Sequence, residues 1–260
     1  MKIVTLTTDF GQRDWFVGAM KGAILAIDSG AKIVDITHEI PAGDIRAGAF
    51  ALAAGCRFFP KGTVHAAVVD PGVGTQRRAI AVKTTNYCFV GPDNGVLSLA
   101  LAQEKVVTIR CLENEKYFLS PISTTFHGRD IFAPVAAHLS KGVDIKKLGP
   151  AIDSFVQLPW PGVVTRPGVV EGEVIFIDRF GNAITNIRNE VVERGKGYRC
   201  KLVVRRNLSC PIAQYYQAVP IGNAVCVPGS AGFLEIAING GSAAEVLGLR
   251  VGKPVALRFG

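Results

Sequence analysis

The sequence predicts an α/β fold, with an N-terminal domain built on a doubly wound, mostly parallel sheet and a smaller C-terminal all-β domain that forms a barrel or sandwich. Three observations support this fold class. Strand and helix patterns alternate from the N-terminus, a Pro/Gly-rich connector follows at 159–168, and short β-rich runs lie beyond it. We therefore expect an α/β domain at 1–160, a linker at 161–167 and a β domain at 168–260.

The first domain opens with a β-α-β-α-β pattern. Apolar residues at helical spacing between Asp14 and Ser29 predict a helix that Gly30 ends. Asp44 has the residue type of an N-cap for a second helix that continues to Phe58. β-branched, apolar runs predict strands at 2–8, 32–37 and 63–69. This alternation is typical of a parallel sheet wound on both faces.

The remaining elements follow from apolar runs separated by turn clusters. In the first domain they are a hairpin of strands 79–83 and 87–90, a helix over 96–103, a strand over 106–111 and a helix over 131–139 that Gly142 ends. Beyond the connector, β-rich runs lie at 169–177, 199–204, 224–227, 233–238 and 254–259. Their short length and polar turns indicate a small barrel or sandwich.

Composition limits the functional classes. With 48% hydrophobic and 19% charged residues among 260, the chain is globular, and no apolar run is long enough to span a bilayer. The N-terminus enters a strand pattern without a leader, so we expect a cytoplasmic protein with no membrane partner. The net charge of +8 comes from scattered basic residues without a zinc-finger or RNA-binding signature, which argues against a nucleic-acid partner.

The six cysteines lie mostly within apolar runs and include no close Cys-x-x-Cys pair. This pattern is typical of small buried hydrophobic residues and differs from that of zinc ligands or a disulfide framework. We therefore expect no metal site.

Polar residues end three of the predicted strands. Asp9, His38 and Asp70 each follow a strand, and ligands bind at the carboxyl ends of the strands in open parallel sheets. Asp70 also opens a Pro-Gly-Val-Gly loop that Arg77 and Arg78 close. A carboxylate and a guanidinium held in this way suit a reactive site, but an ion pair that only stiffens the turn has the same pattern.

His127 precedes the helix at 131–139. Free backbone N–H groups and the helix dipole at that position favour a neutral imidazole that can accept a proton, although a ring that only caps the turn is the alternative. No Gly-x-Gly-x-x-Gly follows the first strand and the sequence contains no Walker loop. A nucleoside ligand would therefore be held mainly through its sugar and base.

Two turns of the second domain concentrate polar and aromatic groups. One carries Asp178, Phe180 and Asn182, and the other lies between Ser230 and Glu235. Such groups suit a ligand with a zwitterion and an aromatic base, but each turn taken alone is more typical of a hairpin loop than of a site.

Taken together, these segments resemble the S-adenosyl-L-methionine hydroxide adenosyltransferase family, which is related to fluorinating and chlorinating enzymes that attack the same molecule. The resemblance covers essentially the whole chain, and the combination of motifs is specific. The motifs are Thr7-Thr8-Asp9-Phe10-Gly11, Asp35-Ile36-Thr37-His38, Val69-Asp70-Pro71-Gly72-Val73-Gly74-Thr75, Gly91-Pro92-Asp93-Asn94-Gly95, Phe126-His127-Gly128-Arg129-Asp130, Phe180-Gly181-Asn182 and Thr185-Asn186-Ile187.

The resemblance implies hydrolysis of S-adenosyl-L-methionine (SAM) to adenosine and L-methionine, through attack of a water-derived nucleophile at the ribose 5′ carbon. SAM is then the substrate, and no cofactor is expected. It also implies a homotrimer whose sites lie between the N-terminal domain of one subunit and the C-terminal domain of the next. The implied catalytic residues are Asp70, Arg77 and His127, and the implied substrate-binding residues are Asp9, Asp178, Phe180, Asn182, Ser230, Glu235 and Ile238.

Departures from the halide-using relatives favour water as the nucleophile. Those relatives carry Tyr-Pro-x-Thr where this chain has Asp70 to Val73, and Tyr-Ser or a similar pair at His127-Gly128. The hydroxyl groups that would line a halide pocket are therefore replaced. A halogenase, a SAM-dependent methyltransferase and a non-catalytic adenosine- or SAM-binding protein are the alternatives, and the sequence leaves open whether Arg77 or Arg78 faces the site.

Overall fold

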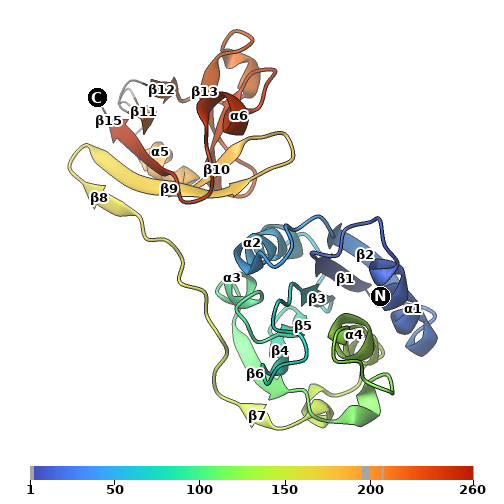
Figure 1. Ribbon diagram of the computed structural model, residues 1–260. Coiled ribbons are helices and arrows are strands. Elements are labelled where there is room, and N and C mark those ends of the chain that lie inside the picture. The colour runs from blue at the N-terminus through green and yellow to red at the C-terminus, as the bar shows by residue number, and fades with distance from the viewer. Residues whose placement is uncertain (1–2, 195–199, 206–207, 260) are drawn as a thin grey trace. The chain divides into compact units, whose positions relative to one another are not determined.

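The computed structural model describes residues 3–194, 200–205 and 208–259. The chain divides into two compact units, Met1–Leu158 and Pro159–Gly260. The first unit is mixed α/β and the second is almost entirely β (Figure 1). The predicted fold class is confirmed. Within the described residues, no helix is long and apolar enough to cross a membrane.

A seven-stranded sheet forms the centre of the first unit, as far as that unit is described. Its order is β2-β1-β3-β5-β4-β6-β7. The pairs from β2 to β5 are parallel, and β4, β6 and β7 are added antiparallel, so the parallel strands lie together at one side. The strands are β1 Ile3–Thr8, β2 Lys32–Thr37, β3 Val64–Val68, β4 Ala79–Thr84, β5 Cys88–Pro92, β6 Val106–Cys111 and β7 Ala151–Ile152.

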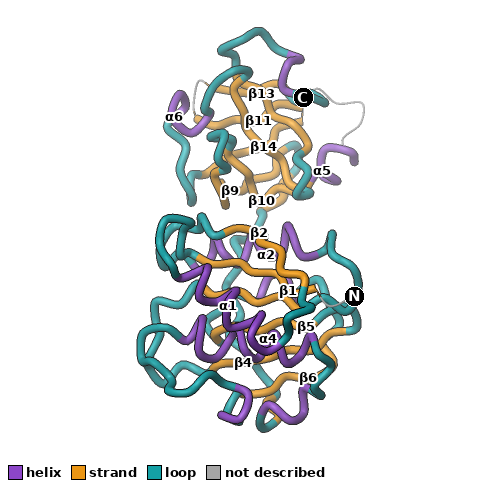
Figure 2. Tube along the Cα trace, turned by 90° about the vertical axis from the view of Figure 1, so that its right-hand side faces the viewer, coloured by secondary structure: helices purple, strands orange, loops and turns teal. Residues whose placement is uncertain are grey.

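Helices cover both faces of this sheet. Helix α1 (Phe16–Ile27) packs with α4 (Ala133–Ser140), and α2 (Ile45–Cys56) packs with α3 (Ser98–Leu101) on the other face (Figure 1 and Figure 2). The side chain of Asp44 accepts a hydrogen bond from the Ala47 N–H at 2.9 Å, which confirms the predicted N-cap. The helix expected over 96–103 is reduced to the four residues of α3.

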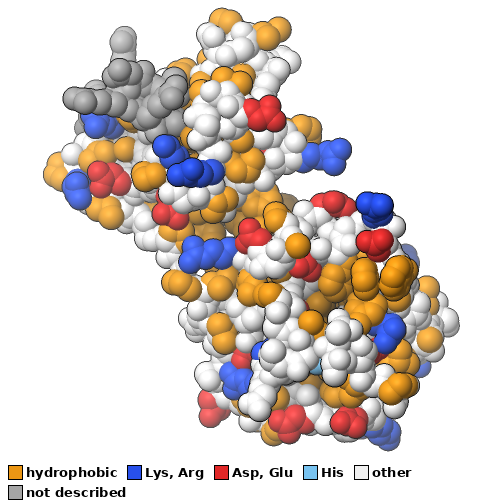
Figure 3. Space-filling model, viewed as in Figure 1, with side chains coloured by type: hydrophobic (Ala, Val, Ile, Leu, Met, Phe, Trp, Pro, Cys, Tyr) orange, Lys and Arg blue, Asp and Glu red, His pale blue; other side chains and the backbone are white. Residues whose placement is uncertain are grey.

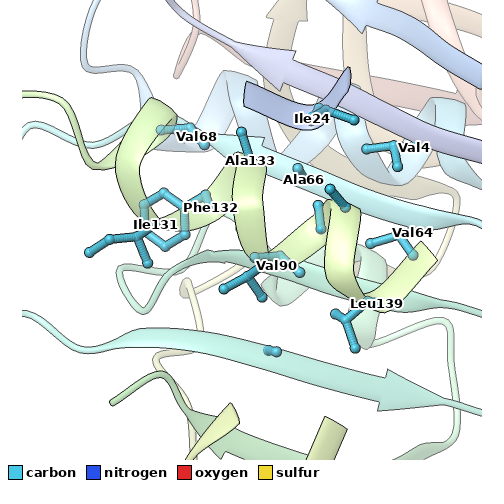
Figure 4. Close-up of a cluster of buried hydrophobic side chains, with 14 of the residues drawn as sticks. Val4, Ile24, Val64, Ala66, Val68, Val90, Ile131, Phe132, Ala133 and Leu139 are labelled. Atoms are coloured by element: carbon cyan, nitrogen blue, oxygen red, sulfur yellow. The ribbon is translucent and has the colours of Figure 1, made fainter. Parts of the chain in front are cut away.

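Apolar side chains of α4 and the strands form the core on one face. Phe132, Ala133 and Leu139 pack against Val64, Val68 and other strand residues of the same cluster (Figure 4). Burial of such side chains is the main source of stability for an element this short. The backbone immediately before α4 is a π-helix, η2 (Gly128–Phe132), where the sequence predicted an ordinary helix from residue 131. The short 3₁₀ turns of this unit are η1 Glu115–Tyr117 and η3 Ile145–Leu148.

The second unit is a nearly closed antiparallel barrel, in the order β12-β11-β15-β9-β10-β14-β13 with β8 paired to β9. A bridge between Ile212 and Cys226 links the two ends of this order. Its strands are β8 Val164–Arg166, β9 Val169–Ile177, β10 Ala183–Arg188, β11 Cys200–Arg205, β12 Leu208–Pro211, β13 Ala224–Pro228, β14 Phe233–Ile238 and β15 Pro254–Phe259, and its helices are α5 Asn189–Arg194, η4 Tyr216–Ala218 and α6 Ala243–Leu247.

Strand β10 is absent from the sequence-based prediction because its centre is polar. Thr185 and Asn186 are nevertheless buried. The Thr185 hydroxyl donates to the Leu234 carbonyl at 2.9 Å, and Asn186 Oδ1 accepts the Glu173 N–H at 2.8 Å. Partners in neighbouring strands therefore satisfy polar groups that would otherwise be costly to bury. Strand β8 similarly lies within the segment expected to be a linker.

The surface and the cysteines agree with the composition. Lys and Arg side chains are scattered over the face seen in Figure 3, with acidic and apolar groups between them. Cys56, Cys88, Cys111, Cys210 and Cys226 are free thiols, and the side chain of the sixth cysteine lies outside the described residues.

Candidate active site

The loop that follows β3 carries two of the predicted catalytic residues. Asp70 begins this loop, and its carbonyl accepts the Val73 N–H at 3.2 Å to close the first turn. Gly74 has a φ of +78°, and a Cβ at this position would collide with the Thr124 carbonyl oxygen. Only glycine allows the two backbones to approach this closely without strain. The Asp70 loop is therefore held against the segment that leads to His127.

Asp70, Arg77 and His127 form one cluster. The Arg77 Nε donates to both Asp70 oxygens, at 3.0 and 2.9 Å, and its Nη2 also contacts Oδ2. The same Nη2 lies 2.7 Å from His127 Nδ1. The side chains of Asp70 and Arg77 are only 5% and 11% exposed. The three predicted catalytic residues are therefore in contact: Asp70 and Arg77 form a nearly buried ion pair, and the His127 imidazole lies against Arg77. Their catalytic role stays a prediction.

The geometry fixes the hydrogen-bonding state of His127. A guanidinium has no acceptor, so Nδ1 must accept from Arg77, and the proton of the neutral ring is on Nε2. Burial lowers the pKa of His127 below 6.5, and the Arg77 charge acts in the same direction, while Asp70 and Asp130 oppose it more weakly. The neutral ring agrees with expectation, and burial and the Arg77 charge are two causes of it.

The two consecutive arginines of the loop, Arg77 and Arg78, form hydrogen bonds with different aspartates. Arg78 pairs with Asp93 through Nε at 2.8 Å and donates to the Ser154 carbonyl at 3.2 Å. The other oxygen of Asp93 accepts the Val156 N–H at 2.7 Å. Arg77 is therefore the arginine of the cluster. Arg78 instead anchors the segment at the end of the first unit.

Asp9 lies at the same sheet edge as Asp70. Strands β1 and β3 pair in parallel with Thr8 opposite Val68, so the two aspartates follow neighbouring strand ends. Asp9 Oδ2 accepts the Gly43 N–H at 2.8 Å, and its other oxygen can accept from a ligand. This position is compatible with the predicted ribose contact.

His38 does not join this edge. Its side chain is fully buried, Nδ1 lies 2.8 Å from Thr8 Oγ1, and Nε2 lies 3.1 Å from Asp35 Oδ1. His38 therefore pairs with Asp35 as the loop-pair alternative describes, although its buried Nε2 lies only at ion-pair distance and makes no hydrogen bond. His38 stabilises the turn after β1, because its backbone carbonyl accepts the Gly11 N–H at 2.7 Å.

Sequence reasoning missed Asp130, which supports the turn that carries His127. Asp130 is completely buried, accepts the Ser123 N–H at 2.8 Å and pairs with Arg129 at 2.6 Å. In a regular α-helix, a residue three positions after His127 would share its face. The wider turn of the π-helix η2 rotates Asp130 away from that face, and a sequence pattern alone gives no signal of such a turn.

The second unit contains a pocket of about 670 Å³. All six residues predicted to bind the methionine part and the base line it, together with Tyr216, which the sequence did not suggest. Asp178 shapes the turn after β9 by accepting the Phe180 and Asn182 N–H groups at 2.9 and 2.8 Å. Phe180 is consequently held at the tip with 77% of its surface exposed. The lining residues are Asp178, Phe180, Asn182, Tyr216, Ser230, Glu235, Ile238, Gly240 and Gly241.

Among the described residues, no group of three or more His, Cys, Asp or Glu side chains could hold a metal ion. The first unit offers a guanidinium and an imidazole, and the second offers carboxylates with an aromatic ring.

The chain thus combines an α/β unit that carries a nearly buried Asp-Arg pair beside an imidazole with a barrel unit that carries an acidic pocket. The model of the SAM hydroxide adenosyltransferase N-terminal domain matches residues 4–149, and that of the C-terminal domain matches residues 172–256. The chain belongs to the SAM hydroxide adenosyltransferase family.

Individual relatives agree with this assignment. The chain is 40% identical to the (R)-S-adenosyl-L-methionine hydrolase of Thermus thermophilus, over 99% of this chain and 100% of that protein. It is 29% identical to a fluorinase of an Actinoplanes species, over 98% of this chain and 97% of that enzyme. The crystal structure of an uncharacterized conserved protein from Thermotoga maritima matches with a TM-score of 0.93 and 38% identity, covering 98% of this chain and 99% of that one.

Proposed function

We propose that this protein hydrolyses SAM to adenosine and L-methionine. The observation that carries the proposal is the Asp70-Arg77-His127 cluster, which presents hydrogen-bond donors to an oxygen nucleophile. Support also comes from relatives named (R)-S-adenosyl-L-methionine hydrolase at 37–40% identity over nearly the whole chain.

The difficult part of this reaction is the nucleophile, because bulk water has a pKa near 15.7. The sulfonium is already a good leaving group. We propose that the Arg77 guanidinium and the His127 Nε2–H stabilise a water molecule with hydroxide character, while Asp70 fixes the guanidinium. The oxygen bonds to C5′ as the C5′–S bond breaks, the electron pair passes to sulfur, and the water proton goes to solvent. Preorganised donors of this kind stabilise developing anions strongly.

His127 in this tautomer is a donor at Nε2, because Arg77 occupies the lone pair of Nδ1. Holding a hydroxide-like nucleophile therefore fits the geometry better than proton abstraction by the imidazole. Both descriptions require a neutral imidazole, but only abstraction requires an unprotonated Nε2.

Water is favoured over halide for an electrostatic reason. Asp70 places a carboxylate where a halide would need hydroxyl donors, and the cluster charge is already balanced by Arg77. A halide ion would have to enter the site against the charge of Asp70, whereas water enters uncharged and is oriented by both groups.

One product analysis tests the proposal. The protein is incubated with each sulfonium epimer of SAM, with and without chloride and fluoride, and the products are separated by chromatography. We expect adenosine and methionine with and without the halide salts. A halogenated deoxyadenosine would indicate a halogenase, S-adenosylhomocysteine a methyltransferase, and unchanged SAM a binding protein.

We further propose that the first domain supplies the nucleophile site and the ribose contact of Asp9, while the second supplies the methionine and adenine contacts. In the proposed homotrimer, these halves come from neighbouring subunits. Light scattering tests the trimer. Co-expression of His127→Ala and Asn182→Ala chains tests shared sites, because mixed trimers should regain part of the activity that each variant alone has lost.

A further inference from the structure

One aromatic ring of the hydrophobic core lies against the Arg77 guanidinium. Phe132 is the last residue of η2, and its side chain is completely buried in the cluster that Figure 4 shows. The guanidinium carbon of Arg77 lies over the face of this ring, 5.2 Å from its centroid. An aromatic face attracts a cation, and the attraction is stronger where water is excluded. Because only 11% of the Arg77 side chain is exposed, the contact lies in such an environment.

The π-helical turn explains why His127 and Phe132 both reach Arg77. In a regular α-helix, residues five apart are rotated by about 140° from each other, so they face different directions. The i→i+5 hydrogen bonds of a π-helix bring such residues to the same side. The Ala133 N–H donates to the Gly128 carbonyl, which is a bond of this type. His127 therefore contacts the guanidinium through Nδ1 at 2.7 Å, and Phe132 contacts it through its ring.

The sequence supplies a local reason for this turn. Pro134 has no N–H, so it cannot donate to the Asp130 carbonyl as the fourth residue along a regular helix would. That carbonyl instead accepts the Leu119 N–H at 2.8 Å, from a segment outside the helix. The Asp130 side chain accepts the Ser123 N–H from the same segment. Phe132 therefore lies on a backbone that is held in place by bonds from outside the helix.

The hydrogen bonds of Arg77 use one edge of its guanidinium. Nε and Nη2 contact Asp70, and Nη2 also contacts His127. A plane held along one edge can still tilt, and a ring against its face limits that tilt. We infer that Phe132 is a positioning residue for the reaction, whose ring holds the Arg77 guanidinium in the orientation that joins Asp70 to His127. This inference rests on the proposed function, in which the guanidinium and the His127 Nε2–H orient the attacking oxygen.

A series of fluorinated rings separates the cation contact from packing. Phe132 is replaced by phenylalanine derivatives with one, two and three ring fluorines, which change the ring volume little and weaken the negative charge of its face. The kcat for adenosine release should fall at each step, and with three fluorines it should be about 3- to 30-fold below that of the unmodified protein. The KM for SAM should change less than about 3-fold, because the ring does not bind substrate.

A second buried phenylalanine provides the matched control. Phe89 on β5 is completely buried and stacks with His65 at a centroid distance of 5.1 Å. The same fluorinated series at Phe89 should keep kcat within about 2-fold of the unmodified protein. A role for Phe132 in packing alone would give the two series equal effects.

A second measurement needs no turnover. Burial lowers the pKa of His127, and the Arg77 charge lowers it further, while Asp70 and Asp130 face the same imidazole and raise it. Phe132→Leu removes the ring that holds the guanidinium, so the pKa of His127 in an NMR titration should rise toward 6.5. Phe89→Leu loses a buried ring of the same size, so its thermal stability should fall to a similar extent while the pKa of His127 stays unchanged.

Two outcomes would overturn the inference. The first is a kcat that stays constant across the fluorinated series at Phe132, or that falls equally in the series at Phe89. The second is a His127 pKa that is the same in Phe132→Leu and Phe89→Leu. If Phe132→Leu does not fold, the fluorinated proteins, which keep the ring, still decide the question. Failure of the proposed hydrolysis is read separately, as an unmodified protein that releases no adenosine, because the NMR titration tests the contact without turnover.

Discussion

Replacing Arg77 with lysine should reduce kcat strongly while leaving the charge in place. The guanidinium contacts both Asp70 oxygens and His127 Nδ1 at the same time, with Nε and Nη2 serving different partners. A single ammonium can keep one of these contacts and loses at least two. At about 1.5–3 kcal/mol for each charge-assisted hydrogen bond, the loss is about 3–6 kcal/mol. This corresponds to a decrease in kcat of about 10²–10⁴, and KM for SAM should change less than about 3-fold.

The neighbouring arginine provides a matched control. Arg78→Lys makes the same chemical change one residue away, on a side chain that pairs with Asp93, and should keep kcat within about 3-fold of the unmodified protein. Adenosine release is followed by chromatography, and thermal unfolding checks that both variants fold. An Arg77→Lys protein with more than about a tenth of the normal kcat, or an equal loss in both variants, would refute the assignment of Arg77 to the cluster.

Four further results follow from the structure. Asp70→Ala and His127→Ala should each abolish adenosine release while calorimetry finds SAM affinity within about 3-fold; full activity in both would contradict the cluster. The acid limb of kcat should have its midpoint below 6.5, because the pKa of His127 is lowered and its neutral ring accepts from Arg77. Gly74→Ala should lower the free energy of unfolding by about 1–3 kcal/mol in urea titrations, since φ is +78° and the Thr124 carbonyl blocks a Cβ. Stability should also fall between pH 6.5 and 4, because burial lowers the pKa of His65 to about 4 and the unfolded chain takes up the proton first; His65→Gln should flatten this loss.

The fold could be predicted where local signals and burial agree. Strands β6, β9, β14 and β15 have the bounds expected from their apolar runs. The N-cap at Asp44 is local chemistry and is also correct. Strand β10 could not be recognised, because the partners of Thr185 and Asn186 come from other strands.

The candidate site, too, could be predicted only where the signal is local in the sequence. The prediction that Asp70, Arg77 and His127 form one site came from the family resemblance. The spacing of residues alone could not decide whether Arg77 or Arg78 belongs to that site. That choice depends on Asp93, which the β4–β5 hairpin brings to Arg78. The turn that positions His127 depends on a π-helix, and although Asp130 belongs to one of the family motifs, its residue type alone does not indicate that it is the buried support of that turn. His38 was misleading because residues that end parallel strands can point either to the edge or inward.

Arg77 and Arg78 contact different aspartates, so the number of residues in their loop determines which arginine reaches Asp70. A deletion of one residue between Asp70 and Arg77 would bring the next guanidinium toward the carboxylate and withdraw it from Asp93, which holds the Val156 N–H. The side chain can vary at exposed positions such as Gln76, whereas an insertion or deletion would shift both arginines relative to their partners. Loop-grafting between water-using and halide-using relatives must therefore preserve the residue count before any side chain is exchanged.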